Sequence, residues 1–393
     1  MPALLQQAIR AAGGLLPFHQ YMQLVLYHPQ YGYYMSQRPR LGRGGDFVTA
    51  PEMTSLFGEL LTLQWIEIWQ RMGEPATFAL VEAGAGSGRL AADIWRTAQR
   101  FPPFAAALTY TIVEISPDFQ ARQRQLLQEV ACPMERIRWC TTLAELAAEE
   151  GVEGVLFSNE FFDAFPVHWL EMTKEGLREL AVAADEQGLT VGRLPVTAPL
   201  TEDHFTRLGI PLPVGMRTEV AVAANVWMSQ AARCLRRGAI VTIDYGLTRA
   251  EYYHQGALPE GTLTGYYRHQ QVNNPLLHPG EMDLTSHVHF TDLAEAGEAA
   301  GLQTLGYGTQ AWFLMGLGIL QRLEQLARTQ SAEQMQAIRQ TVMRLLMPQG
   351  MGDRFKVLVQ SRGLAVDPPL AGFSLHNAKQ RLQTPVAAVP CTG

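Results

Sequence analysis

Hydrophobic and polar positions follow two alternating periods between residues 77 and 158. Short apolar runs typical of buried strands are separated by segments whose apolar residues recur every three or four positions, as in amphipathic helices. This alternation predicts a parallel sheet that is covered by helices on both faces. The predicted strands are 77–84, 108–116, 136–140 and 152–158, and the predicted helices are 88–100, 118–130 and 142–150.

The pattern changes on either side of this α/β core. Residues 1–75 predict helices joined by an aromatic, glycine-rich loop over 27–52. Residues 168–196 predict an antiparallel meander with turns at Glu175-Gly176 and Gln187-Gly188. The remaining predicted elements are a helix over 219–236, a strand over 238–246, helices over 292–301 and within 311–346, and a last strand over 355–363. The Gly-, Pro- and His-rich segment 247–289 is too long for a plain connector, which indicates a functional role.

Composition and charge narrow the class of protein. The chain has 393 residues, of which 47% are hydrophobic, so it can bury one large core or two smaller ones. A formal net charge of −6 leaves no broad basic field, and nucleic acid is not expected as the main partner. The four cysteines have no CxxC spacing, which argues against a zinc site or a disulfide framework and suits a reducing cytoplasm.

Two segments bear on targeting and membranes. The opening MPALLQQAIRAAGGLLPF lacks the uninterrupted apolar core of a signal peptide. The longest strongly apolar run, 311–320, is too short to span a bilayer. We therefore expect a soluble, cytoplasmic protein without membrane insertion.

A glycine-rich turn follows the first predicted strand. Gly84, Gly86 and Gly88 stand at alternate positions, with Ala85 between the first two, and the turn runs directly into a helix. Glycines allow a tight turn and let backbone N–H groups approach a ligand at the N-terminus of that helix. Any turn between a strand and a helix favours glycine, but three alternate glycines after an acidic strand end favour a ligand site.

The acidic residues near this turn indicate which ligand it binds. Glu82 would repel a pyrophosphate, and Arg89 stands where the dinucleotide fingerprint GxGxxG has its third glycine. S-adenosylmethionine has an amino group, a sulfonium and no phosphate, so a carboxylate suits it. Glu114, with Ile115 beside it, ends the second predicted strand and can accept hydrogen bonds from ribose hydroxyls. The pattern favours S-adenosylmethionine over NAD and assigns these residues to its site.

Polar residues also end the fourth predicted strand. Asn159, Glu160 and Asp163 follow the apolar run VLF, with two phenylalanines between them that we expect in the core. In an open α/β sheet ligands bind at the carboxyl ends of strands, and an amide with carboxylates can hold an amine or a guanidinium. We assign these three residues to catalysis, and Asn159 also to cofactor binding. The alternative is a capped turn, with Asp163 as the cap.

A second glycine-rich loop, GRGGDFVTAPE (42–52), can form a lid or a wall for the substrate. Its candidate residues are Gly45, Asp46, Phe47, Thr49 and Glu52. The alternative is a helix start, because Thr49-Ala50-Pro51-Glu52 combines a cap residue, a helix-start proline and a glutamate at capping-box spacing.

Four further polar residues lie late in the chain. Asp244 and Tyr245 end the predicted strand 238–246, so both reach the same edge of the sheet and are secondary substrate candidates. His287 and His289 alternate along SHVHF and would face the same way on a strand. No third ligand has an obvious spacing, and we expect no metal.

Several motifs together carry a resemblance that extends to about residue 362. They are LYHPQYGYY, GRGGDFVTAPEMTSLFGELL, VEAGAGSGRLAADIW, IVEISP, SNEFFDAFPVHW, YYRHQ, GEMDLTSHVHFTDL, FLMGLGI and GDRFKVLVQSRG. In these motifs the chain resembles the MidA-type class I methyltransferases, which are similar to the mitochondrial methyltransferase that assists assembly of respiratory complex I. Where that family commonly has Asp after His-Val, this sequence has His289.

The resemblance implies an α/β class I (Rossmann-like) methyltransferase fold with a mostly parallel seven-stranded sheet and S-adenosyl-L-methionine as cofactor. Together with the pattern of elements and the Pro- and Ala-rich end of the chain, it predicts a helical region with a lid loop over 1–75, a methyltransferase domain over 76–363 and a flexible C-terminal tail over 364–393. The domain would carry insertions at about 168–218, 247–289 and 310–347.

Two functions remain open at this point. The first is a protein methyltransferase that modifies an arginine of a partner protein, with a respiratory-complex subunit as a candidate implied by the resemblance. The second is an assembly or chaperone-like binding protein that retains the fold. The intact glycines and acidic positions favour the first, and an NAD enzyme comes third. The oligomeric state stays open, with a homodimer among the alternatives.

Overall fold

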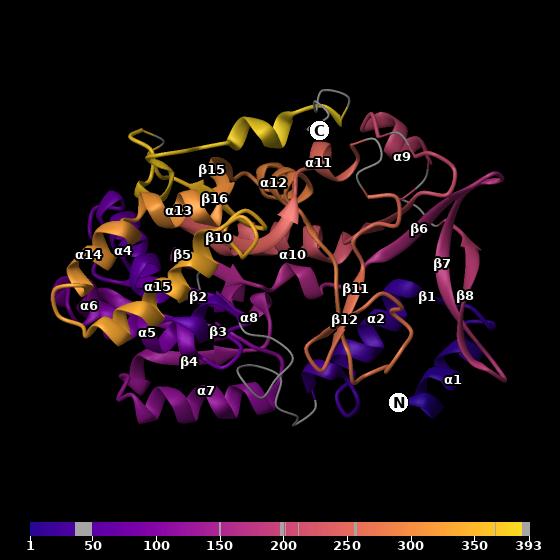
Figure 1. Cartoon of the computed structure of the whole chain (residues 1–393), viewed down its shortest axis with the longest axis horizontal. Coiled ribbons are helices and arrows are strands. Elements are labelled where there is room, and N and C mark those ends of the chain that lie inside the picture. The colour runs from indigo at the N-terminus through magenta and orange to yellow at the C-terminus, as the bar shows by residue number, and fades with distance from the viewer. Residues whose placement is uncertain are drawn as a thin grey trace.

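A twisted, mostly parallel sheet forms the centre of the molecule (Figure 1). The computed structural model describes residues 1–35, 49–148, 151–196, 200, 202–210, 212–254, 258–365 and 367–386. The strand order of the sheet is β15-β16-β10-β5-β2-β3-β4, and the short β14 (Val288–His289) pairs with β10. The seven strands are β2 (Phe78–Ala83), β3 (Leu108–Val113), β4 (Ile137–Cys140), β5 (Val152–Asn159), β10 (Leu235–Leu247), β15 (Gln303–Thr309) and β16 (Phe355–Arg362).

The order of the strands decides where a ligand can bind. Strand β16 runs antiparallel to both of its neighbours, whereas β10, β5, β2, β3 and β4 are parallel. From β2 the chain first adds β3 and β4 on one side, and then β5 and β10 on the other. The carboxyl ends of β2 and β5 therefore meet where the strand order reverses, which is the usual ligand position in such sheets. The predicted α/β fold with a mostly parallel seven-stranded sheet is confirmed.

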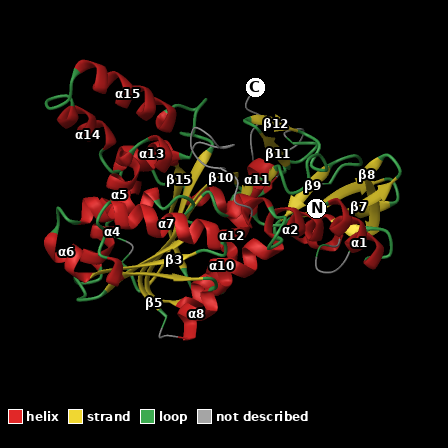
Figure 2. Ribbon diagram, turned by 90° about the horizontal axis from the view of Figure 1, so that it is seen from below, coloured by secondary structure: helices red, strands yellow, loops and turns green. Residues whose placement is uncertain are grey.

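Helices cover both faces of the sheet (Figure 2). Strand β5 shows why its apolar run is unbroken: Val155 and Phe157 are buried on one face, and Leu156 is buried on the other. The first face packs against α4 (Ser55–Arg71), α5 (Arg89–Ala98), α6 (Pro102–Ala107), α7 (Pro117–Glu129), α13 (Gln310–Gly316), α14 (Ile319–Leu326) and α15 (Ala332–Leu346). The second face packs against α8 (Leu143–Ala148), α10 (Val222–Cys234) and α12 (Phe290–Ala299).

A smaller lobe of helices and antiparallel strands lies at the right of Figure 1. Its sheet has the order β1-β7-β6-β9, and β8 pairs with β7. Two N-terminal helices pack on this sheet through a separate apolar cluster that includes Tyr21 and Trp169. The elements of the lobe are α1 (Pro2–Ala11), β1 (Leu16–Pro17), α2 (Phe18–Tyr27), η1 (Tyr33–Met35), β6 (His168–Thr173), β7 (Gly176–Asp185), β8 (Gly188–Pro195), α9 (Glu202–Arg207) and β9 (Arg217–Val220). Helix α3 (Ala50–Met53) packs instead in the core of the large sheet, where Ala50 is buried.

The predicted meander is present, but both of its turns lie one residue earlier than expected. Thr173 pairs with Gly176, so the turn residues are Lys174-Glu175. Asp185 pairs with Gly188, so the turn residues of the second hairpin are 186 and 187. Each glycine opens the following strand, with φ of 102° at Gly176 and 134° at Gly188, a range that side chains disfavour.

The segment between β10 and β14 folds into a three-stranded sheet that packs on the N-terminal helices. Leu276, Met282 and Leu284 are buried in the same cluster as α1 and α2. Its elements are α11 (Arg249–Tyr252), β11 (Thr264–Tyr267), β12 (Gln270–Val272) and β13 (Asp283–Thr285).

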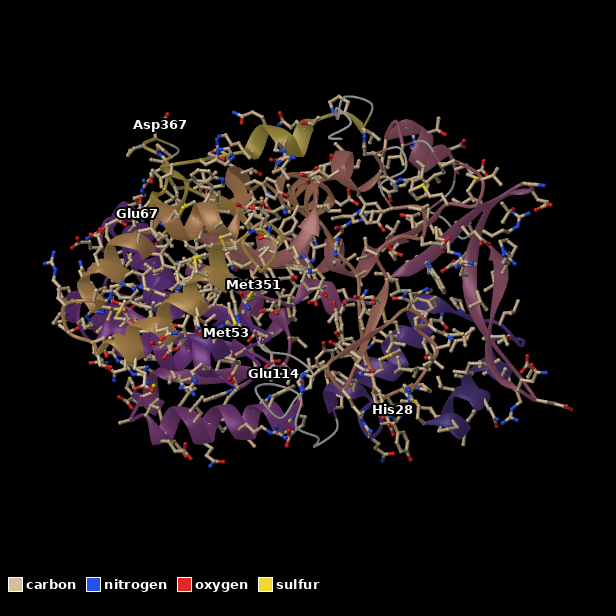
Figure 3. The ribbon with its side chains drawn as sticks, in the orientation of Figure 1. His28, Met53, Glu67, Glu114, Met351 and Asp367 are labelled. Carbon is tan, nitrogen blue, oxygen red and sulfur yellow. The ribbon has the colours of Figure 1, made fainter. Side chains whose placement is uncertain are left out.

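Two features of the C-terminal third differ from the sequence-based expectation. Residues 303–309 are not predicted as a strand, because QTLGYGT contains two glycines. The structure shows strand β15 there, paired with β16. The expected loose tail is packed over 367–386: Leu370 and Phe373 are 2% and 3% exposed. Its short helices are η4 (Ala371–Phe373) and η5 (Lys379–Gln383), and the first N–H of η4 donates a 2.9 Å hydrogen bond to Glu67 of α4, labelled in Figure 3. Apolar anchors in a Pro- and Ala-rich segment explain this packing.

Among the described residues, no helix is both long enough and apolar enough to cross a lipid bilayer.

Candidate active site

A cleft of about 1640 Å³ opens at the carboxyl edge of the parallel sheet. Its walls come from the segments that follow β2, β3, β4, β5 and β10, from the N-terminal region and from the segment between β10 and β14. Glu114 and Met351, labelled in Figure 3, both line it. The predicted site residues that line the cleft are Thr49, Glu52, Glu82, Gly84, Ala85, Gly86, Glu114, Ile115, Asn159, Glu160, Asp163 and Tyr245.

Five predicted site residues do not line the described cleft. Gly45, Asp46 and Phe47 lie outside the described residues. Gly88 caps the N-terminus of α5 with φ of 83° and packs on Gln123, so it shapes the turn from below. Asp244 is fully buried beneath the cleft.

The glycine-rich turn after β2 has a backbone that side chains would distort. Gly84 and Gly86 have φ of 69° and 52°, in the left-handed region. A Cβ atom on Gly84 would lie 2.7 Å from Cδ2 of Phe161, closer than non-bonded carbons approach. A side chain at position 84 would therefore collide with Phe161, which packs directly against the turn.

Glu82 lies at the base of the turn as a buried carboxyl group. Its Oε2 accepts a 2.6 Å hydrogen bond from the hydroxyl of Tyr110 on β3. Burial raises the pKa of Glu82 to about 7, although the bond from Tyr110 opposes this rise. The residue combines a structural hydrogen bond with a position on the cleft wall.

Glu114 is held by a residue that sequence reasoning missed. Its carboxylate accepts bonds from the backbone N–H of Ser116 at 2.8 Å and from Nε2 of Gln123 at 3.3 Å. Gln123 also donates to the Gly86 carbonyl at 2.9 Å, so one buried side chain joins the glycine turn to this carboxylate. A glutamine on the buried face of an amphipathic helix is the signal that could have found it. Burial raises the pKa of Glu114 to about 7.

Apolar surface borders the same part of the cleft. Ile115 is 46% exposed although it is large and apolar, and it lines the cleft beside Glu114. Thr141 and Thr142, which follow β4, line the cleft too and were not predicted. An apolar surface next to hydrogen-bonding groups is the usual composition of a nucleoside-type pocket.

The polar end of β5 has an unusual backbone. Glu160 has φ of 52°, which is uncommon for a residue with a side chain, and its N–H donates to the Ile243 carbonyl at 2.9 Å. Nδ2 of Asn159 donates to Oε1 of Glu160 at 3.0 Å. Burial, reinforced by the charge of Asp163, raises the pKa of Glu160 to about 8. Oδ1 of Asn159 is buried and has no hydrogen-bond partner among the described residues.

Asp244 positions this strand end from below. Its Oδ2 accepts the backbone N–H groups of Phe161 and Phe162 at 3.0 and 2.9 Å, and its Oδ1 accepts the N–H of Tyr245 at 2.9 Å. The predicted contact of Asp244 with a substrate is therefore wrong, because the side chain is occupied by the backbone of the turn. Phe162 is buried as expected, whereas Phe161 lines the cleft.

Asp163 and Tyr245 form the next part of the wall. The Tyr245 hydroxyl donates to Oδ2 of Asp163 at 2.7 Å, and its ring packs edge-on against His287 and Phe355. Burial raises the pKa of Asp163 to about 6, and the bond from Tyr245 opposes that rise. The carboxylates of Asp163 and Glu160 thus reach the cleft within one short turn.

The described end of the predicted lid loop contacts the glycine turn. The Ser87 hydroxyl donates to Oε1 of Glu52. Thr49 begins α3 without a side-chain cap hydrogen bond, so the capping box that the spacing suggested is not formed. Glu52 instead connects the N-terminal region to the glycine-rich turn after β2 through its bond with Ser87. Both Thr49 and Glu52 line the cleft.

The smaller lobe contributes a wall that sequence reasoning did not assign. The Tyr34 hydroxyl donates to Oδ1 of Asp283 at 2.9 Å, and the Tyr27 hydroxyl donates to the Ala164 carbonyl at 2.8 Å. Both tyrosines and Asp283 line the cleft, and the bond from Tyr27 to Ala164 joins this wall to the turn that follows β5. The aromatic run YGYY was the sequence signal that could have indicated this wall. Its contacts could not be predicted, because Tyr34 and Asp283 are 249 positions apart in the chain.

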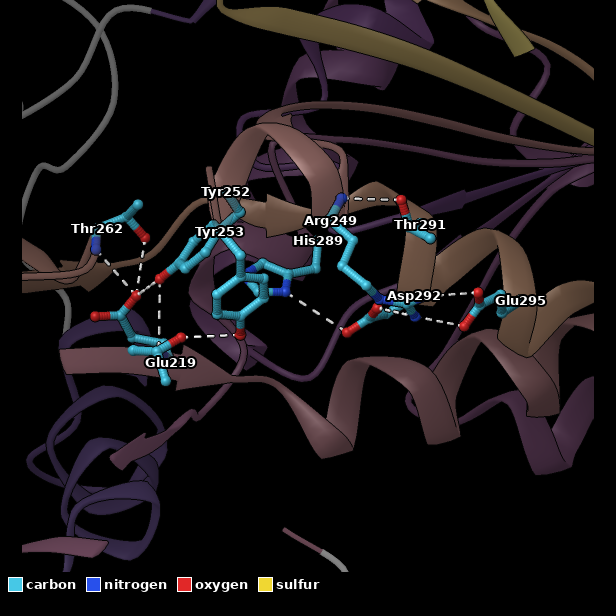
Figure 4. A network of polar contacts seen from close by, with 10 residues as sticks. Glu219, Arg249, Tyr252, Tyr253, Thr262, His289, Thr291, Asp292 and Glu295 are labelled. Carbon is cyan, nitrogen blue, oxygen red and sulfur yellow. Dashed lines mark hydrogen bonds and ion pairs between the residues drawn. The ribbon is translucent and has the colours of Figure 1, made fainter. Parts of the chain in front are cut away.

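The two histidines of SHVHF have different surroundings. His287 lines the cleft near Tyr245, whereas His289 packs against Tyr252 with ring centres 4.0 Å apart and faces Asp292 at 3.5 Å (Figure 4). In the same network Glu219 accepts bonds from the Tyr252 hydroxyl and from the N–H of Thr262, the latter at 2.9 Å. Glu219 thereby fixes the loop around residue 262, which lines the cleft.

Comparison with known proteins agrees with this geometry. Residues 60–308 match the model of a family described as "Putative S-adenosyl-L-methionine-dependent methyltransferase". The chain is 33% identical to the mitochondrial protein arginine methyltransferase NDUFAF7 of Xenopus tropicalis, over 92% of this chain and 86% of the relative. It is 31% identical to the Drosophila melanogaster homolog over the same shares, and 30% identical to the human protein over 87% and 79%.

Two solved structures are similar over almost the whole chain. Both are of a Burkholderia thailandensis protein. The one bound to S-adenosyl-homocysteine has a TM-score of 0.86 at 35% identity and covers 96% of this chain and 95% of that chain. A native structure gives a TM-score of 0.84 at 34% identity, with the same coverage.

Proposed function

Because this chain belongs to the family of S-adenosyl-L-methionine-dependent methyltransferases that includes the NDUFAF7 proteins, we propose that it methylates an arginine side chain of a partner protein. Its cofactor is S-adenosyl-L-methionine. The acceptor is the proposed part, and the observation that carries it is the pair of carboxyl groups of Glu160 and Asp163 on the cleft wall beside the cofactor turn.

The residues of the cleft fit the cofactor. The glycine turn brings the backbone of Gly84 and Gly86 to the cleft wall, where backbone groups can approach a ligand. Glu114 offers a carboxylate for ribose hydroxyls, and Ile115 offers exposed apolar surface for a base. When bound, S-adenosylmethionine supplies an electrophilic methyl group on its sulfonium sulfur. We assign Glu82, Gly84, Ala85, Gly86, Glu114, Ile115 and Asn159 to its binding, with Gly88 shaping the turn.

The size of the cleft leaves space for a protein side chain as well. About 1640 Å³ exceeds the roughly 300–1,000 Å³ of a typical small-ligand pocket. Glu160, Asp163 and Asp283 all line the cleft and are acidic, which favours a cationic acceptor. A guanidinium has five donors in a planar fork, and paired carboxylates accept them with defined geometry. The acceptor site is therefore best suited to arginine.

Glu160 has the properties of the residue that orients the acceptor and takes up its proton. Its pKa is raised to about 8 by burial and by Asp163, so it can exchange a proton near neutral pH. Its left-handed backbone places the side chain at the cleft and is fixed by the bond to Ile243. Asp163, steadied by Tyr245, adds a second acceptor of hydrogen bonds. Asn159 and Asp244 position this turn.

The proposal is tested by radiolabelled methyl transfer. Extract from cells that lack this protein is incubated with the purified enzyme and methyl-labelled cofactor, and labelled peptides are identified by mass spectrometry. We expect one or a few proteins labelled on arginine. Label on lysine, on carboxyl groups or only in small molecules would overturn the arginine assignment. A protein that binds the cofactor and clients but transfers no methyl group would favour the chaperone-like alternative.

A further inference from the structure

Three side chains that can ligate a metal meet in the smaller lobe, outside the cleft. They are His19 of α2, His168 at the start of β6 and Glu179 of β7. Nδ1 of His168 lies 2.8 Å and Nδ1 of His19 lies 3.3 Å from Oε1 of Glu179. In the part of the chain that the structure describes, this is the one group of three or more His, Cys, Asp or Glu side chains whose ligand atoms all lie within 4.8 Å of one another.

The burial of the three side chains is graded. The side chain of Glu179 is 3% exposed, that of His168 19% and that of His19 29%. The carboxylate therefore lies inside the lobe, and the two imidazoles lie between it and solvent. An ion could enter from the side of the imidazoles and keep one position open to water.

The two imidazoles stack on each other and converge on one carboxylate oxygen. Their rings are stacked, with centroids 4.1 Å apart and planes inclined by 28°, and both turn Nδ1 toward the same oxygen. If both rings were protonated, two like charges would lie face to face at that distance. Two neutral imidazoles and a carboxylate that share one divalent cation satisfy all three groups without this repulsion.

We propose that His19, His168 and Glu179 form a binding site for a divalent transition-metal ion, and that this ligand set best suits Zn²⁺. Metal–ligand distances of about 2.0–2.2 Å in a tetrahedral site place the ligand atoms about 3.3 Å apart. The His19–Glu179 separation of 3.3 Å already matches, and the His168–Glu179 separation of 2.8 Å has to widen by about half an ångström. Water completes the fourth position.

The role of this ion would be structural. None of the three ligands lines the cleft, so the ion would not contact the reacting groups. It would instead fasten α2 to the antiparallel sheet. Helix α2 carries Gln23 and Tyr27 to the cleft, and β6 begins two residues after Pro166, which also lines it. The metal site therefore joins two elements that form the cleft wall, and it does not depend on the proposed acceptor.

Titration of the metal-free full-length protein with Co²⁺ and Zn²⁺ tests the proposal. We expect one ion per chain by calorimetry, visible absorption bands of four-coordinate Co²⁺, and a melting temperature that rises with Zn²⁺ because the ion binds the folded state. His19→Gln and His168→Gln should each weaken binding by more than about 100-fold, since partners one step removed from a metal are already worth 10–100-fold. The matched control is His376→Ala, at an exposed position far along the chain, which should bind as the unaltered protein does.

Two results would overturn the proposal. One is the absence of stoichiometric Co²⁺ or Zn²⁺ binding by a protein that melts cooperatively, which would leave the three residues as a hydrogen-bonded group only. The other is binding that survives unchanged in both histidine variants, which would place the ion elsewhere. His19 is the most exposed of the three ligands, so its variant is expected to fold. Loss of metal binding in that variant can therefore be assigned to the missing ligand.

Discussion

The hydroxyl group of Tyr245 donates a 2.7 Å hydrogen bond to Oδ2 of Asp163, and so joins the end of β10 to the short turn that follows β5. Directly below, the carboxylate of Asp244 accepts the backbone N–H groups of the same turn. Two neighbouring residues of β10 therefore fix this turn: Tyr245 binds the side chain of Asp163, and Asp244 binds the backbone. The acidic wall of the cleft depends on this pair of contacts.

Tyr245→Phe tests the first of these contacts. The variant keeps the ring that packs on His287 and Phe355 but removes the bond that lowers the pKa of Asp163. The pKa of Asp163, about 6 in the intact protein, should rise, and the acid limb of the pH profile of kcat/KM should move to higher pH. Tyr31→Phe, at a residue 46% exposed, is the control. An unshifted acid limb would show that Asp163 does not titrate in the reaction.

Glu160→Gln separates transfer from cofactor binding. The variant keeps the size of the side chain, but it cannot ionise and cannot take up a proton from the acceptor. We expect methyl transfer to fall by about two to four orders of magnitude, while affinity for S-adenosylmethionine stays nearly unchanged. Single-turnover rates beside a cofactor titration measure the two effects. Normal transfer by the folded variant would remove Glu160 from the mechanism.

The same variant should change how stability depends on pH. The pKa of Glu160 is raised from its ordinary value of 4.5 to about 8 in the folded protein. Its contribution to stability is therefore complete below the ordinary value and is lost as pH rises through about 8. Glutamine lacks this dependence, so the melting temperature of the variant minus that of the intact protein should increase between pH 5 and pH 8. Glu175→Gln, on an exposed hairpin turn, should show a constant difference.

Gly84→Ala tests the glycine turn with a matched control. The new Cβ would lie 2.7 Å from the ring of Phe161, in addition to the strain of a φ of 69°. Gly73→Ala has a comparable φ of 83° but meets nothing within 4 Å, so it carries the backbone strain of about 1–2 kcal/mol alone. We expect calorimetry to show lost cofactor affinity for Gly84→Ala only. Equal affinities of the two variants would show that the contact with Phe161 has no part in binding.

Gln123→Met removes the link between the turn and Glu114 at nearly constant volume. The bonds to the Gly86 carbonyl and to Glu114 are lost, and the indole N–H of Trp139 loses its 2.9 Å acceptor. A buried polar group that loses its hydrogen-bond partner costs about 1–3 kcal/mol. We therefore expect cofactor binding to weaken by about tenfold or more. Gln125→Met on the exposed face of the same helix is the control. Equal affinity in both variants would leave Gln123 with a packing role only.

The sequence by itself determined the α/β class, the glycine turn and the edge of the sheet where the polar residues gather. These features are local or follow from a rule of topology. Hydrophobic periodicity specifies strand or helix within a few residues, and parallel strands bring their carboxyl ends to one edge. For this reason Glu82, Glu114 and Glu160, although spread over 79 positions of the chain, could be assigned to one cleft in advance.

The tertiary structure alone decided which polar residues face the cleft and which support it. Asp244 follows the same pattern as Glu160, yet it is buried under the turn, because only the register of β10 against β5 sets which backbone it meets. Strand β15 exists through its pairing with β16, and the packed segment after residue 367 exists through contacts with α4. His19 and Glu179 are 160 residues apart. Contacts between distant segments leave no periodic trace along the chain, since they depend on how the elements pack.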